Sequence, residues 1–172
     1  LLIQSFFLYK AYKPITHTNI TSSSVLEKIK SISELNTVEM YYSSIIDFSD
    51  AKYLNTIQIP FTKKQFIFTV KAKVKAEIDL SKLESKDIDV KDNKTISIKL
   101  PTAAITSKEI LEYKKKKEKD GLFNEITNED TFNALNKFKE DLDKQSIDNG
   151  ILVTAKEKEK ISLTQLLTGL GY

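Results

Sequence analysis

Residues 66–80 read FIFTVKAKVKAEIDL, and this stretch decides the fold because its apolar and polar side chains alternate. Every even position from Phe66 to Leu80 is apolar, whereas every odd position from Thr69 to Asp79 is polar or charged. A period of two over fifteen residues is typical of a strand with one buried and one solvated face. The remainder of the chain must therefore cover the apolar face of this strand.

A second alternating run, TISIKL at residues 95–100, follows the first. Asp92, Asn93 and Lys94 precede it, and Asp and Asn are common in tight turns because they tolerate positive φ. We expect both runs to belong to one half-buried antiparallel sheet. Residues 37–48 alternate in the same way and predict a further strand, in which only one of Tyr41 and Tyr42 faces the core.

Helices are indicated before and after the strand segments in the sequence. Ser24 and Glu27 have the spacing of a capping box before a short amphipathic helix over residues 25–35, and Ser81 and Glu84 repeat that spacing before a single turn. Residues 128–168 carry apolar side chains at helical spacing and predict two helices joined near Asn149–Gly150. Residues 103–118 fit a helix or a strand, and the turn at Asp120–Gly121 favours a strand pair.

These elements predict an α+β fold, with a mainly antiparallel sheet packed against a C-terminal helical pair and a short N-terminal amphipathic helix. We divide the chain into residues 1–13, a Thr- and Ser-rich linker at 14–24, and a single domain at 25–172. Residues 1–8 are apolar, and aromatic and lysine side chains follow them. Two interpretations stay open for residues 1–13: the tail of a membrane anchor or signal segment, or a short segment docked on the domain.

Composition excludes several classes of active site. The chain has no cysteine, which excludes thiolate chemistry. Its one histidine is His17 in the linker, and a Ser-His-Asp triad would need it, so we reject a triad. Its four glycines form no phosphate-binding loop. We therefore expect no cofactor, no metal site and no catalytic residue.

Two clusters remain as candidate sites. Lys71, Lys73 and Lys75 project from one face of the predicted strand, and we expect Lys99 to add to this basic surface. All 27 basic residues are lysine, and the absence of arginine disfavours specific nucleic-acid recognition. Glu77 and Asp79 are paired carboxylates on one strand face, which could serve acid–base hydrolysis. The structural alternative pairs Glu77 with a cross-strand lysine and uses Asp79 to cap the turn at Ser81.

Four short motifs occur in the order found in one bacterial family. They are ISELNTVE at 32–39, VKAEIDLS at 74–81, ISIKLP at 96–101 with AITS at 104–107, and FN at 123–124. Over about residues 22–171 the chain resembles domain-of-unknown-function family 4230, although Glu77 stands where the family usually has glycine. The resemblance implies one N-terminal membrane helix and a domain outside the cytoplasm, and it carries no catalytic residues.

The sequence thus predicts a non-enzymatic binding or structural domain, anchored to the cytoplasmic membrane by its N-terminal segment and located outside the cytoplasm. Its expected partners are the membrane and an envelope protein or a wall polymer. Two alternatives remain open: a carboxylate-based hydrolase using Glu77 and Asp79, and a cytoplasmic polyanion binder using the lysine face.

Overall fold

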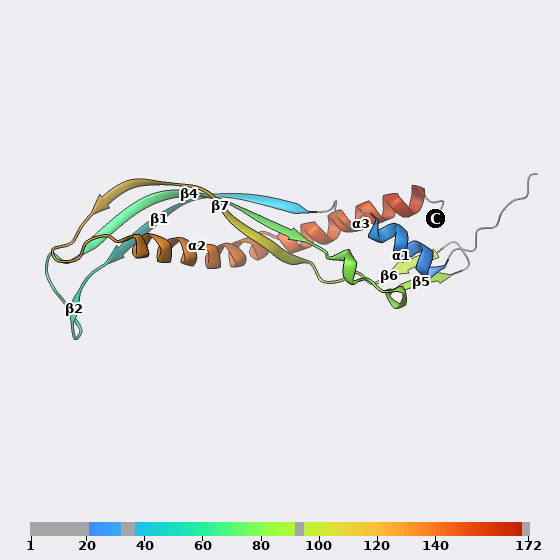
Figure 1. The fold of residues 1–172 in the computed structure, drawn as a ribbon, viewed down its shortest axis with the longest axis horizontal. Helices are drawn as coiled ribbons and strands as arrows, with labels where there is room; N and C mark the ends of the chain where they lie inside the picture. Colours follow the sequence, from blue (N-terminus) through green and yellow to red (C-terminus); the bar gives the residue numbers. More distant parts are fainter. Residues whose placement is uncertain (1–20, 32–36, 92–94, 170–172) are drawn as a thin grey trace, which may run out of the picture.

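The computed structural model describes residues 21–31, 37–91 and 95–169, which form an elongated α+β structure (Figure 1). Its elements are α1 (Ser22–Lys30), β1 (Val38–Asp50), β2 (Tyr53–Leu54), β3 (Ile57–Gln58), β4 (Lys64–Glu77), two 3₁₀ turns η1 (Leu80–Lys82) and η2 (Ser85–Asp87), β5 (Ile88–Lys91), β6 (Thr95–Ile98), β7 (Ala104–Lys119), α2 (Asn128–Asp148) and α3 (Ile151–Gly169). The predicted fold class is confirmed.

Strand β4 is the centre of the main sheet, in which the strand order within the described residues is β1-β4-β7. Both neighbours are antiparallel to it, and β1 runs in register from Val38 opposite Ala76 to Asp50 opposite Lys64. The even-numbered side chains from Phe66 to Ala76 are at most 1% exposed. The predicted alternation is therefore confirmed, as is the strand predicted at residues 37–48, where Tyr42 packs on the core and Tyr41 is exposed.

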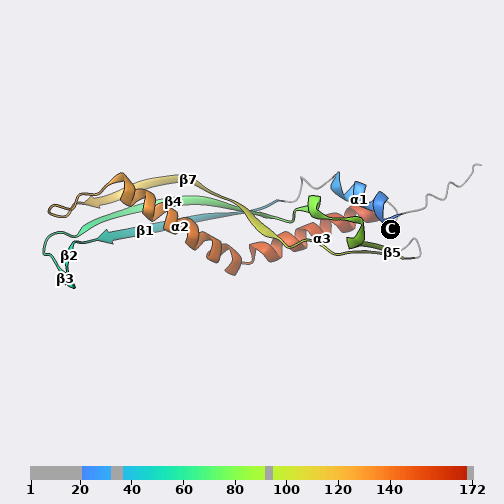
Figure 2. The same cartoon turned by 60° about the horizontal axis from the view of Figure 1, so that its bottom comes forward.

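Helices α2 and α3 follow one another along one face of this sheet (Figure 2). Their buried side chains, among them Phe138, Leu142, Ile151 and Ala155, pack in one cluster with the even side of β4. The predicted break between the helices is confirmed at Asn149–Gly150. Gly150 has a φ of +79°, a conformation that glycine adopts without the steric penalty of a side chain.

A second apolar cluster lies at the α1 end of the structure. It joins Val25 and Ile29 of α1, Leu83, Ile88 of β5 and Leu163 of α3. The hairpin of β5 and β6 belongs to this cluster, with Ile88 opposite Ile98. The expectation that residues 66–80 and 95–100 share one sheet is wrong, because the 16-residue β7 offers β4 a far longer ladder than the four-residue β6 could.

Residues 103–118 fit either a helix or a strand by sequence, and in the structure all but the first of them belong to one continuous strand, β7. They do not form half of a strand pair around Asp120–Gly121. The Asp120–Gly121 turn was predicted to join two strands, and this is wrong. Gly121 and Asn124 close a tight turn that leads instead into α2. Thr127 and Asp130 form the capping box that begins this helix.

Two predicted caps are displaced by a few residues. Helix α1 begins at Ser22, with the capping box formed by Thr21 and Ser24 instead of Ser24 and Glu27. Asp79, rather than Ser81, caps the turn η1 through the Ser81 backbone N–H. The reason is that the cap is the residue with extended backbone, and Thr21 and Asp79 have that conformation.

Residues 1–13, most of the predicted linker, His17 and the turn at 92–94 lie outside the described residues. In the ranges that the structure describes, no helix combines the length and the apolar character that a membrane crossing requires.

Gly121 gives a direct test of this packing. A Cβ atom at this position would lie 2.2 Å from the backbone oxygen of Thr62, so the two loops must separate to accommodate any side chain. We expect Gly121→Ala to reduce the free energy of unfolding by about 2 kcal/mol or more, measured by urea denaturation. The matched control is Gly169→Ala, where the added Cβ meets no described atom within 4 Å and we expect no loss. Equal stability of both variants would contradict the packing of these loops.

Candidate functional site

The predicted lysine face lies on the side of the sheet opposite the helices, and its charges are paired. Each lysine of this face contacts a glutamate of a neighbouring strand: Lys71–Glu112 at 3.2 Å, Lys73–Glu109 at 3.4 Å and Lys75–Glu39 at 3.0 Å. Glutamates from both outer strands thus neutralise the central row. Such exposed pairs add little stability, but they cancel the positive potential of this face.

Hydrogen bonds favour the ionised form of two of these glutamates, Glu39 and Glu112. The Tyr41 hydroxyl donates to Glu39 over 2.8 Å and Lys75 adds a second contact, so the pKa of Glu39 lies below its ordinary value. Lys114 and then Lys71 lower the pKa of Glu112 in the same way. Both glutamates therefore retain their negative charge at neutral pH, and the face presents alternating charges instead of a basic ridge.

Lys99 is not brought to this face. It follows β6 at the α1 end of the structure, where its backbone N–H donates to the Asp87 carbonyl over 2.9 Å. The prediction that Lys99 adds to Lys71, Lys73 and Lys75 is wrong, because it requires the two alternating runs to be neighbouring strands. The pairing of β5 with β6 removes that basis.

Glu77 and Asp79 both have structural partners. Glu77 accepts a hydrogen bond from the Thr37 hydroxyl over 3.2 Å. Asp79 accepts one from the Ser81 backbone over 3.1 Å and pairs with Lys82 at 3.3 Å. The Ser81 hydroxyl is the main cause of the low pKa of Asp79, which favours the ionised form. Among the described residues, no cluster of three acidic or histidine side chains could hold a metal ion.

A concavity lies beside α2, and the width of the layers explains it. One helix is about 10 Å across, and the axes of the two outer strands of this sheet are themselves about 10 Å apart. A helix centred on β4 therefore reaches the outer strands but does not cover their side chains completely. Side chains on the helix side of β4 are completely buried, whereas Met40, Ile46 and Phe48 of β1 and Ile110 of β7 are only partly covered. Helix α2 therefore leaves a groove on each side, one beside β1 and one beside β7.

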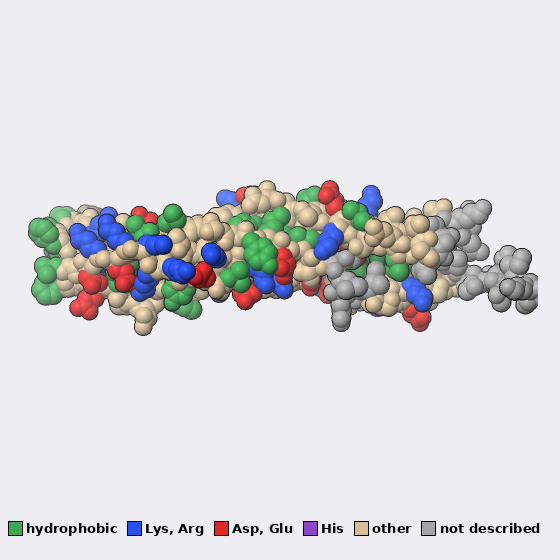
Figure 3. Space-filling model, turned by 90° about the horizontal axis from the view of Figure 1, so that it is seen from above, with side chains coloured by type: hydrophobic (Ala, Val, Ile, Leu, Met, Phe, Trp, Pro, Cys, Tyr) green, Lys and Arg blue, Asp and Glu red, His purple; other side chains and the backbone are tan. Residues whose placement is uncertain are grey.

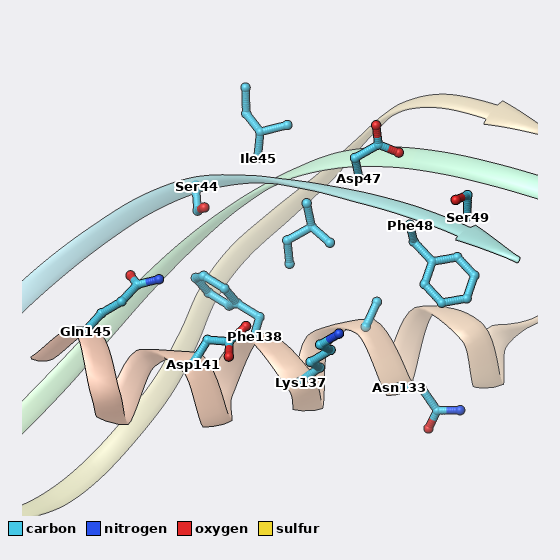
Figure 4. Close-up of a pocket in the computed structure, with 12 residues that line it drawn as sticks. Ser44, Ile45, Asp47, Phe48, Ser49, Asn133, Lys137, Phe138, Asp141 and Gln145 are labelled. Atoms are coloured by element: carbon cyan, nitrogen blue, oxygen red, sulfur yellow. The ribbon is translucent and has the colours of Figure 1, made fainter.

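The groove beside β1, here called the β1 groove, has a volume of about 560 Å³ (Figure 4). Phe48 and Phe138 lie between the strand and the helix, whereas Ile45 and Asp47 point away from α2. Its other lining residues are mostly polar: Ser44, Ser49, Asn133, Lys137, Asp141 and Gln145. The groove thus combines an apolar floor with a rim of hydrogen-bonding groups.

The two outer strands differ in how regularly they pair with β4, and this affects whether another strand can bind at their edges. Strand β7 carries three register irregularities along its pairing with β4, and bulges of this kind obstruct the addition of another strand. Strand β1 pairs with β4 over thirteen residues in unbroken register. Ile45 on this strand is 71% exposed. The edge next to the β1 groove is therefore the regular one.

Sequence reasoning did not identify this groove. Its residues come from two segments about 90 positions apart, and each segment shows only the ordinary pattern of an amphipathic strand or helix. The relevant signal is the alternation at residues 37–48, interrupted only at Ser44 and Ile45, compared with the less regular pattern at 103–118.

Comparison with known proteins gives a family but no activity. A family model described as a protein of unknown function (DUF4230) matches residues 27–172. Comparisons with curated proteins and with solved structures gave no match. Because the match covers nearly the whole described fold, this chain belongs to the DUF4230 family of proteins of unknown function.

Proposed function

We propose that the protein is a non-enzymatic, membrane-anchored binding module outside the cytoplasm, and that its ligand is an extended polypeptide segment held in the β1 groove. The observation that carries the proposal is the regular edge of β1, which no other described strand covers, beside a groove with an apolar floor. The anchoring part rests on the apolar residues 1–8, the aromatic and lysine side chains after them, and the resemblance to family members with an N-terminal membrane helix.

An extended segment suits this edge because of its backbone chemistry. Along an outer antiparallel strand, alternate residues direct their N–H and C=O groups away from the sheet, where they bind water or another strand. A segment that adds as a fourth strand would satisfy these groups on β1. Its alternate side chains would then lie over Ile46 and Phe48, with Lys137 and Asp141 available to select charge.

The two alternative functions receive less support. A polyanion binder through Lys71, Lys73 and Lys75 would have to compete with Glu39, Glu109 and Glu112 for those lysines. A hydrolase would have to release Glu77 from Thr37 and Asp79 from Ser81 and Lys82. The β1 groove needs no such rearrangement.

Site-specific photocrosslinking on α2 tests the binding site. Lys137 lines the β1 groove and Lys139 lines the groove beside β7, so a photoreactive residue at each position samples opposite sides of one helix. In intact cells we expect a polypeptide adduct from position 137 and none from position 139. Ile45→Lys should abolish the adduct, because a charged side chain on an edge strand opposes the addition of another strand.

Leu111→Lys on β7 is the matched control and should leave that adduct unchanged, since Leu111 is also exposed and also lies on an outer strand. Equal adducts from positions 137 and 139, or an adduct that persists in Ile45→Lys, would exclude the β1 groove as the binding site.

Protease accessibility tests the proposed location. The full-length protein carries a tag after Tyr172, and protease is added to spheroplasts with a cytoplasmic protein as the control for lysis. We expect the tag to be digested while the cytoplasmic control survives. A tag that stays protected until detergent is added would contradict the extracytoplasmic location.

A further inference from the structure

The end of the structure farthest from α1 consists of two loops that are bonded together. Residues 51–63 carry the small β2–β3 hairpin, and residues 120–126 join β7 to α2. The Leu122 N–H donates to the Phe61 carbonyl over 2.7 Å, and the Asn124 side-chain amide donates to the Thr62 carbonyl over 2.8 Å. These bonds hold both loops in one arrangement.

Six large apolar side chains on these loops are more than half exposed and form what we call the apolar tip. They are Tyr53, Leu54, Ile57, Phe61, Leu122 and Phe123, with 56–84% of each exposed. Figure 3 shows apolar side chains gathered at this end of the molecule, with lysines beside them. Because they sit on protruding turns, they form a projection and not a groove.

The backbone at the tip is unfavourable for the residues that occupy it. Phe61 has a φ of 61° and Phe123 a φ of 53°, a left-handed conformation in which bulky side chains are rare. Neither ring is buried in return, since Phe61 is 84% and Phe123 83% exposed. Strained backbone that serves to expose an aromatic side chain indicates a functional contact outside the molecule.

The lysines near the apolar tip favour a partner that carries negative charge. Residues 50–65 and 115–126 contain seven lysines and four carboxylates, and Asp130 of α2 pairs with one of these lysines, Lys64. Within the described residues, Lys52, Lys63, Lys116, Lys117 and Lys119 form no ion pair. The end that exposes apolar side chains thus also carries five lysines that no described carboxylate pairs with.

We propose that the apolar tip inserts into the interfacial region of a bilayer that contains anionic phospholipid. Exposed aromatic and aliphatic side chains with lysines behind them match the acyl and headgroup layers of such a surface. A symmetric contact with the tip of a second copy would bring like charges together, which opposes association. This inference does not depend on the β1 groove.

Tryptophan fluorescence tests the proposal, because the natural chain contains no tryptophan. Phe61→Trp and Phe123→Trp place the only such fluorophore at the tip. Val153→Trp, at another exposed position on α3, is the control. With vesicles of phosphatidylcholine and phosphatidylglycerol, we expect both tip variants to shift to shorter wavelength and to be quenched by brominated acyl chains. The control should do neither.

Replacement of the five unpaired lysines by glutamine in Phe61→Trp should weaken partitioning into these vesicles about tenfold or more. Residues 1–13 are common to all variants, so binding by that segment alone would sediment the protein with vesicles without changing the tip fluorescence. That outcome would overturn the proposal. So would a shift that needs no lipid and grows with protein concentration, which would identify a second copy as the partner.

Discussion

The structure depends on burying the even-numbered side of β4 beneath two consecutive helices. Phe66, Phe68, Val70 and Val74 are completely inaccessible to solvent, and Phe66 stacks on Phe48 of β1 with ring centroids 4.6 Å apart. Burial of each such aromatic or aliphatic side chain contributes about 1.5–3 kcal/mol. The helices, both outer strands and the break at Gly150 are arranged around this one strip of apolar surface.

This constraint also determines where the molecule is open. A single layer of helix covers the centre of the sheet but not its margins, so each outer strand borders a groove. The polar face of β4 is closed by cross-strand ion pairs, and the bulges of β7 protect one edge. The edge of β1 is left regular. The buried Lys64, which contacts Asp130 at 2.7 Å, ties the start of β4 to the start of α2 near the apolar tip.

The sequence predicted the elements better than their pairing. Alternation at Phe66–Ala76 and helical spacing at Phe138 and Leu142 follow from local burial, which one segment reports by itself. The pairing of β4 with β7 depends on competition between distant segments, and the short run at 95–98 has the same local pattern as a sheet strand. For the same reason the lysine face was recognised but its glutamate partners were not, and the β1 groove left no local signal.

Residue-resolved amide hydrogen exchange of the protein without ligand tests the central claim, which is that β1 has an open and regular edge. Amides of β4 bond to strands on both sides and should exchange slowest. Along Val38–Asp50, we expect slow and fast amides to alternate, because every second N–H points away from β4. Uniformly slow exchange along β1 would show that this edge is already covered, and would contradict the account of the molecule as a binding module.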